Sequence, residues 1–150
     1  MSKVNASSVA EYILWKLGEY GDVVTNLKLQ KLLYYTQAWY LALNDGKPLF
    51  TAQFQAWVHG PVHPSTYHHY KKHGRNPLPV PEYEPILPTR AKDQIDVILD
   101  VFAKYTGWEL EYMTHHEDPW RDAREGLGAL DRSTQVIPDE AMWKYYSNLN

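Results

Sequence analysis

The chain has 150 residues, a formal net charge of −3, twelve Tyr, six Trp and seven His, and no cysteine. That length suits one domain with its own hydrophobic core, and the lack of cysteine excludes disulfides, thiolate metal sites and cysteine nucleophiles. The acidic balance argues against a strongly basic nucleic-acid surface, and no apolar run is long enough to span a membrane, so we expect a cytoplasmic protein with no membrane partner.

The first two predicted elements are helices, over about residues 6–20 and 27–44. Apolar side chains recur at spacings of three and four residues in both, and a glycine soon follows each end. In the second helix two adjoining stripes are apolar, which leaves a narrow polar line of Gln30, Gln37 and Asn44. A helix that is apolar on most of its sides packs against several neighbours, so we expect this helix to form the centre of the domain.

The middle of the chain is predicted to be less helical. Alternating apolar residues favour a short extended or β-hairpin segment at about residues 49–58, and Gly60-Pro61 indicates a turn. Pro64 is well placed to begin a short helix that reaches about residue 73. Five prolines between residues 76 and 88 exclude a helix or a central strand there, so we interpret that stretch as an extended connection across the surface.

The last third of the chain is predicted to be helical again. We expect helices at about residues 90–105, 108–115 and 118–126, a loop over 128–136, and a final helix after Pro138. Asp118 and Pro119 are typical of an N-cap and of the first helical position. The sequence therefore predicts a mainly α fold: a single compact domain over residues 1–150, with about six to seven helices and one small extended segment.

Histidines are the first candidates for chemistry. His69 and His73 are four residues apart on a predicted helix, a spacing that places both rings on one face, as a metal site requires. No third ligand can be identified, so a solvated helix end is the simpler interpretation. We expect neither a metal nor another cofactor.

His115 and Glu117 suggest a second possibility, a general base with its orienting carboxylate. Positions this close rarely face each other on a helix, and the chain has no nucleophile elbow and no phosphate-binding glycine loop. The alternative is structural. Thr114, His115 and Glu117 would then hydrogen-bond free backbone groups at a corner between helices, while Asp118 caps the next helix.

The start of the central helix, with Thr25 and Lys28, loosely resembles a helix-turn-helix. Lys28 and Lys31 are the only basic residues of this helix, and its surface is too apolar to lie in a DNA groove. A core helix is the better interpretation, and we expect no nucleic-acid partner.

Three stretches of sequence stand out from this helical background. They are Asn26–Tyr35 (NLKLQKLLYY) with Ala38–Leu41, Ala56–Val62 (AWVHGPV) with Tyr67, and Thr114–Arg124 (THHEDPWRDAR). Taken together and in this order, they resemble the Panacea domain, the family of phage-associated GepA-like proteins that includes the SocA-like antitoxins. The resemblance covers about residues 5–125, and the order and spacing of the three stretches make it specific.

The resemblance implies a binding role and no reaction. Members of this family act as antitoxins that neutralise small toxic proteins, which are often encoded beside them. The SocA-like member is similar to an adaptor that delivers its toxin to the ClpXP protease. For this chain, the resemblance therefore implies a cognate protein toxin as partner, a ClpXP-type protease as a further one, and no enzymatic activity.

The residues of the three stretches are expected to be structural. Gly60-Pro61 would fix a turn, tryptophans would pack the core, and His59, His115 and Glu117 would share a buried polar network. The polar and aromatic residues of this signature set are Lys28, Lys31, Tyr34, Trp57, His59, Pro61, Thr114, His115, Glu117 and Trp120.

Aromatic residues that the predicted packing does not use are the candidates for a toxin contact, because Tyr and Trp often anchor protein interfaces. This candidate contact set is Tyr67, Tyr70, Tyr83, Trp143, Tyr145 and Tyr146. For each of them, a ring lying partly on the surface is the alternative interpretation.

Two rival functions remain open. One is a small hydrolase, with or without a metal, that uses His59, His115 and Glu117. The other is a phage regulator that binds a host protein. A toxic protein encoded beside this chain would favour the antitoxin over both.

Overall fold

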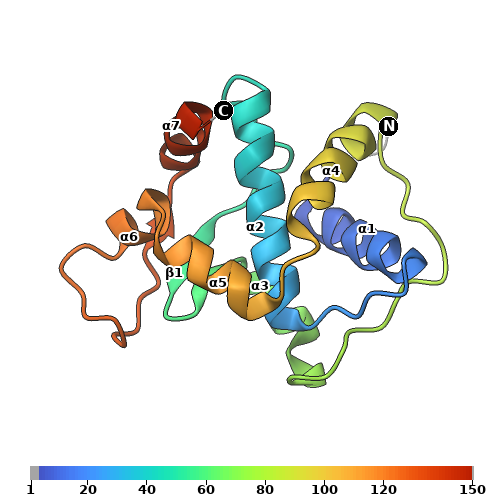
Figure 1. Cartoon of the computed structure of the whole chain (residues 1–150), viewed down its shortest axis with the longest axis horizontal. Helices are drawn as coiled ribbons and strands as arrows, with labels where there is room; N and C mark the ends of the chain where they lie inside the picture. Colours follow the sequence, from blue (N-terminus) through green and yellow to red (C-terminus); the bar gives the residue numbers. More distant parts are fainter. Residues whose placement is uncertain (1–3, 150) are drawn as a thin grey trace.

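The computed structural model describes residues 4–149 and shows a mainly α fold, as predicted (Figure 1). The α-helices are α1 (Ala6–Glu19), α2 (Asn26–Leu43), α3 (Pro64–Tyr70), α4 (Thr89–Phe102), α5 (Gly107–His115), α6 (Asp118–Ala123) and α7 (Asp139–Leu149). The strands are β1 (Phe54–Trp57), β2 (Gly60–Val62) and β3 (Val136–Ile137), and one 3₁₀ turn, η1 (Lys71–His73), extends α3. Within residues 4–149, no helix has the length and apolar character needed to cross a membrane.

Helix α2 is the central element of the fold. The Thr25 side chain caps it by accepting a hydrogen bond from the backbone N–H of Lys28, and every residue from Leu29 to Ala38 is buried. Helices α1, α4, α5 and α7 all pack against it. Figure 1 shows α7 and α4 on opposite sides of α2 and α5 lying across its lower part. The prediction of a central helix is confirmed.

Gln30 and Gln37 of the polar line lie inside the protein, while Asn44 is half-buried at the end of the helix. Gln37 is fully buried; its Nε2 donates to the carbonyl of Phe50 at 2.7 Å, and its Oε1 accepts from the N–H of Leu49 at 3.0 Å. Gln30, also buried, accepts from the N–H of His63 at 2.9 Å. The segment before β1 and the start of α3 have backbone groups that no other backbone group bonds. The two glutamine amides bond these groups and so fix both segments to the core.

The hairpin turn is not where the sequence predicted it. The turn residues are Val58 and His59, since Trp57 pairs with Gly60 in the antiparallel ladder between β1 and β2. Pro61 therefore lies in a strand and pairs with Ala56. This is possible because β2 is an edge strand, where the N–H that proline lacks has no partner to lose.

A third strand lies at the end of the stretch over 128–136 that the sequence predicts to be a loop. Val136 and Ile137 form β3 and pair with Gln55 and Phe54 of β1, which gives the strand order β2-β1-β3. A strand of two residues is too short to show an alternating pattern. The pairing brings the chain after α6 back to the hairpin.

Two helix ends differ from prediction for a reason that involves the site below. Asp118 is the first residue inside α6 and Glu117 holds the cap position, but the Glu117 side chain makes no capping bond because it points inward. The helix ends at Ala123, before the predicted residue 126, where the Arg124 side chain instead bonds carbonyl groups of other segments.

The proline-rich stretch over 76–88 contains neither helix nor strand, as predicted. Leu78 and Leu87 are buried and anchor it, and the N–H of Leu78 donates to the carbonyl of Val24 at 2.7 Å. Between the anchors, Val80 packs against α1 at Gly18, where a Cβ would come within 2.6 Å of its side chain. The stretch therefore follows the outside of α1 on its way to α4 (Figure 1).

Gln37→Met is expected to lower the free energy of unfolding by about 2–4 kcal/mol, because the Leu49 N–H and the Phe50 carbonyl then stay buried without partners. Denaturant unfolding followed by circular dichroism measures the effect. Gln53→Met, at an exposed position, is the control and should change stability by less than about 0.5 kcal/mol. Equal effects of the two substitutions would contradict this role for Gln37.

Candidate functional site

Parts of all three signature stretches meet beside α2, around Lys31. The Lys31 side chain is only 1% exposed, and its Nζ donates a hydrogen bond to the carbonyl of Pro61 at 3.0 Å. Thr114 of α5 is buried on the other side of Gly60 and donates its hydroxyl to the carbonyl of Glu111 at 2.7 Å. We call the group Lys31, Gly60, Pro61, Glu111 and Thr114 the Lys31 cluster.

Gly60 is required at this point by both backbone conformation and space. Its φ of +104° lies in a region that residues with a side chain rarely adopt. A Cβ at Gly60 would also lie 2.8 Å from Cε of Lys31 and 3.0 Å from Oγ1 of Thr114. The hairpin can therefore approach α2 and α5 closely enough for the lysine bond only because residue 60 is glycine.

Burial changes the acid–base behaviour of Lys31. It lowers the pKa of this amine from the ordinary 10.5 to about 7, and the negative charge of Glu111 opposes the shift. The cause is the loss of water around the charged form, which a single backbone carbonyl replaces only in part. Lys31 is thus a buried amine that titrates near neutral pH.

Glu111 connects the Lys31 cluster to the surface. Its Oε2 lies 3.2 Å from Nδ1 of His59, at the tip of the hairpin, and the His59 side chain is mostly exposed. Its Oε1 is buried and has no hydrogen-bond partner among the described residues. The Glu111 carboxylate therefore acts electrostatically on the buried lysine amine and pairs with a solvent-exposed imidazole.

His115 belongs to an aromatic stack beside the cluster. Its ring lies on that of Trp120, with centroids 4.0 Å apart and planes 13° apart. Its Nε2 is buried without a partner among the described residues. Burial lowers the pKa of His115; the positive charges of Lys31 and Arg124 act in the same direction, and Glu111 acts against them.

Trp120 and Arg124 attach this stack to the hairpin. Trp120 Nε1 donates to the carbonyl of Trp57 at 2.8 Å, and the Arg124 guanidinium lies 5.0 Å from the centre of the Trp120 ring. Arg124 also donates to the carbonyls of Ala56 at 3.0 Å and Asp131 at 2.6 Å. A single cation thereby ties α6, β1 and the loop after α6 together.

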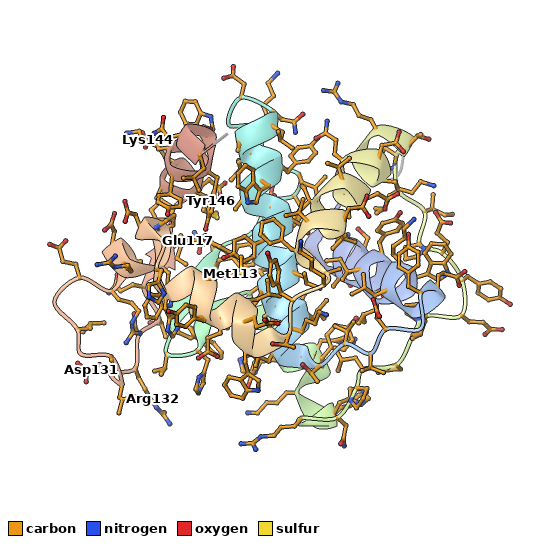
Figure 2. The ribbon with its side chains drawn as sticks, viewed as in Figure 1. Met113, Glu117, Asp131, Arg132, Lys144 and Tyr146 are labelled. Carbon is orange, nitrogen blue, oxygen red and sulfur yellow. The ribbon has the colours of Figure 1, made fainter. Side chains whose placement is uncertain are left out.

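Glu117 forms a separate buried network with tyrosines. Its Oε1 accepts hydrogen bonds from Tyr35 at 2.6 Å and from Tyr146 at 2.9 Å, and the hydroxyls of Tyr146 and Tyr34 are 3.0 Å apart. Figure 2 shows Glu117 next to Tyr146, so this network joins α7 to α2. Burial raises the pKa of Glu117, and the two tyrosine hydrogen bonds act in the opposite direction.

The expected common network of His59, His115 and Glu117 is therefore wrong. His59 is exposed and pairs with Glu111, His115 stacks on Trp120, and Glu117 bonds tyrosines. The reason is geometric, since residues 115 and 117 lie on either side of the corner between α5 and α6 and point to different neighbours. The same separation removes the arrangement that a hydrolase using these three residues needs.

Two further signature residues lie away from the Lys31 cluster. Lys28 donates to the carbonyl of Ala103 at 2.7 Å, beyond the end of α4, where burial lowers its pKa. Trp57 is half-buried at the edge of the hairpin, and its ring meets that of Tyr67 edge to face at 5.0 Å. The remaining members contribute to the Lys31 cluster, the aromatic stack or the tyrosine network.

The candidate contact set divides in two. Tyr70 and Tyr146 are buried, so the structure removes them from the surface that a partner can reach. Tyr70 on α3 and Tyr146 on α7 face the core. Their spacing did not reveal this burial, because neither residue belongs to a long apolar stripe. Tyr83 is 77% exposed, and Tyr67, Trp143 and Tyr145 are half-buried.

Three residues that the sequence does not single out are prominent in the structure. Glu111 is central to the electrostatics of the Lys31 cluster, and its one signal in the sequence is its position four residues before His115. Trp108 and Tyr112 are 65% and 67% exposed on α5. Their signal is also a four-residue spacing, on the face of the helix away from buried Leu110 and Thr114.

The Lys31 cluster has the residue types of an acid–base site, but its geometry serves packing. The lysine amine is out of contact with solvent, and its hydrogen bond goes to the protein backbone. Within residues 4–149, no three His, Asp or Glu side chains come together as a group that could hold a metal ion. What the arrangement does is hold the hairpin and α5 in fixed positions against α2.

Comparison with known proteins relates this chain to one family. The family model described as "Antitoxin SocA-like, Panacea domain" matches residues 29–121. Antitoxin SocA of Caulobacter vibrioides is 39% identical over 71 residues, which cover 47% of this chain; the chain spans only 37% of the length of that curated relative. No solved structure matches. The matched residues include the Lys31 cluster and the stack on Trp120 but neither α1 nor α7.

Gly60→Ala is expected to destabilise the fold by about 2–4 kcal/mol, because the new Cβ adds a close contact with Lys31 and Thr114 to the backbone strain. Gly21→Ala is the matched control: Gly21 also has a positive φ, but a Cβ there has open space around it. The control should lose only about 1 kcal/mol. Thermal and denaturant unfolding measure both, and equal losses would exclude the close approach at Gly60.

Lys31 should make stability depend on pH. Between pH 7 and pH 10.5 the unfolded chain holds a proton on this lysine that the folded chain has released, so its contribution to the unfolding free energy rises with pH. Lys31→Met removes that contribution. The stability of Lys31→Met relative to wild type is therefore expected to fall as pH rises through this window.

Denaturant unfolding of both proteins across this pH range tests the expectation. Lys72→Met, which replaces an exposed lysine, is the control, and its stability relative to wild type should not change with pH. A difference between Lys31→Met and wild type that stays constant from pH 7 to pH 10.5 would show that Lys31 keeps its ordinary pKa.

Proposed function

Since the chain belongs to the SocA-like antitoxin family, which is defined by the Panacea domain, we propose that it is an antitoxin that binds and neutralises a cognate protein toxin. The observation that carries this proposal is the family match over residues 29–121, the part of the chain that contains most of α2, the hairpin, α5 and the start of α6. The similarity to Antitoxin SocA supports it. The toxin is the protein partner of the proposal, and no enzymatic activity is part of it.

The arrangement of the signature residues agrees with a binding scaffold. Lys31, Glu117 and Arg124 are the ionisable side chains that an enzyme could use, yet each bonds protein groups that link two or more elements. Such bonds stabilise the positions of α5, α6 and α7 around α2. A rigid framework of this kind presents its outer surface to a partner with little loss of conformational entropy on binding.

The proposal extends to domain organisation and location. We take residues 1–150 as a single domain in the cytoplasm, where a toxin made by the same cell is met. Helices α1, α3, α4, α5 and α7 all contact α2, and α6 contacts α5 and α7, which favours one cooperative unit. Among the candidate contact residues, Tyr67, Tyr83, Trp143 and Tyr145 remain proposals because each retains exposed surface.

Co-expression tests the proposal directly. The protein encoded by the neighbouring open reading frame is expressed alone and together with this chain in the same cells. We expect growth arrest in the first case and growth in the second, because a bound toxin cannot reach its target. A toxic neighbour that this chain does not neutralise, or a harmless neighbour, would contradict the proposal.

The same assay separates direct inhibition from delivery to a ClpXP-type protease. Toxin abundance is followed by immunoblot in cells with and without the protease. Neutralisation at constant toxin level, independent of the protease, indicates direct inhibition. Delivery is indicated if the toxin disappears in cells that have the protease and if cells without the protease are no longer rescued.

A further inference from the structure

Two large aromatic side chains lie exposed on one face of α5. Trp108 is 65% exposed and Tyr112 is 67% exposed, and they are one helical turn apart. Their helix lies across the lower part of α2 (Figure 1), with Leu110 and Thr114 on the side that is buried. The pair therefore faces away from the core, where burial does not account for it.

Each of the two rings is supported by a histidine. The His59 ring meets that of Trp108 edge to face, with centroids 6.2 Å apart, and the His116 ring lies 4.3 Å from that of Tyr112. His116 Nδ1 is also 2.9 Å from the carbonyl oxygen of Tyr112. We call Trp108, Tyr112, His59 and His116 the α5 aromatic face. Because each of the two rings already packs against a histidine, it loses less side-chain freedom on binding than an unsupported ring would.

The charge around the α5 aromatic face is negative. Helix α5 carries Glu109 and Glu111 and has neither lysine nor arginine. Glu111 contacts the face through His59 and contributes charge from just beneath the surface, since its side chain is mostly buried. Glu109 is exposed, and its Oε1 accepts a hydrogen bond from the N–H of Thr106 at 2.8 Å. Its charge acts on Lys28, whose amine is bonded to the Ala103 carbonyl.

Aromatic rings next to carboxylates are the surroundings that a guanidinium group prefers in proteins. Arginine stacks its plane on Trp or Tyr and donates paired hydrogen bonds to a carboxylate, whereas lysine offers a single charge and no plane. Trp and Tyr are also the residues that most often dominate the free energy of protein interfaces, together with arginine.

We propose that the α5 aromatic face docks an arginine-bearing segment of the partner protein. The identity of that partner as a protein toxin rests on the proposed function. An arginine of the segment stacks on Trp108 or Tyr112, and the carboxylates of Glu109 and Glu111 supply the charge that selects a basic partner. The surface differs from the contact set that the sequence suggested, none of which lies on α5.

A labelled peptide of alternating arginine and serine tests the chemistry on the whole chain. Fluorescence anisotropy measures its binding, and peptides with citrulline or glutamate in place of arginine are compared. We expect the arginine peptide to bind at least about tenfold more tightly than either, and more weakly as salt is added. Equal binding of the citrulline peptide would overturn the proposal.

Protein variants locate the site. Trp108→Ala with Tyr112→Ala is expected to weaken binding of the arginine peptide about tenfold or more, while Tyr20→Ala, which removes an equally exposed ring on α1's end, leaves it unchanged. Thermal unfolding shows whether the double variant keeps its fold, as the exposure of both rings leads us to expect. A folded double variant that binds the arginine peptide like wild type would overturn the proposal.

Growth rescue then separates this proposal from the function on which it rests. If the double variant no longer neutralises the toxic neighbour and Tyr20→Ala still does, the surface is supported. If the double variant rescues growth as wild type does, the surface is wrong and the antitoxin function stands. If no neighbour is toxic but the arginine peptide binds at Trp108, the antitoxin function fails and the surface stands.

The oligomeric state tests another occupant, a second copy of this chain, whose Lys71, Lys72 and Arg75 offer exposed basic groups. Analytical ultracentrifugation of wild type and the double variant decides this. A dimer that the double variant dissociates would assign the face to self-association and overturn the proposal. A monomer in both cases supports a different protein as the occupant.

Discussion

The burial of α2 on every side is the constraint on which the rest of the structure depends. A polar side chain on such a helix has no water to bond, so it must find a partner inside the protein or destabilise the fold. Gln30, Lys31 and Gln37 meet this requirement with backbone groups of segments that have no regular structure of their own or lie at a sheet edge. The central helix thereby dictates where the start of α3, the hairpin and the segment before β1 lie.

The same constraint explains why the three stretches of family sequence occur together. The first supplies Lys31 and the tyrosines of α2, the second supplies Gly60 and Pro61, and the third supplies Glu117, Trp120 and Arg124. Each contact between them needs a residue type that the others cannot replace: a glycine where the backbone approaches, a cation that reaches several carbonyls, a carboxylate between two phenols. The three stretches therefore occur together because their side chains pack against one another. Lys31, Glu117 and Arg124 point inward because their bonding partners lie there.

What remains for a partner is the surface that these contacts do not use. On α5, one side carries Leu110 and Thr114 toward α2, and the other carries Trp108 and Tyr112 toward solvent. The charge of Glu111 acts on the buried lysine amine, and its Oε2 lies 3.2 Å from Nδ1 of His59 at the tip of the hairpin. Helix α5 therefore contributes to both the Lys31 cluster and the α5 aromatic face. The hairpin also contributes to both, so a change in its position would alter the contacts of both.

The amino-acid sequence by itself determined the mainly α fold, the central place of α2, the proline-rich crossing and the family, because each depends on spacing along the chain or on local residue types. It did not determine the turn at Val58 and His59, the strand β3, the inward direction of Glu117 or the burial of Tyr70 and Tyr146. These depend on which distant segments pack together: the strand pairing selects the turn, and tyrosines far apart in the sequence draw Glu117 away from its helix cap. Only the tertiary structure separates the aromatic residues that fill the core from those, on α5 above all, that face the solvent.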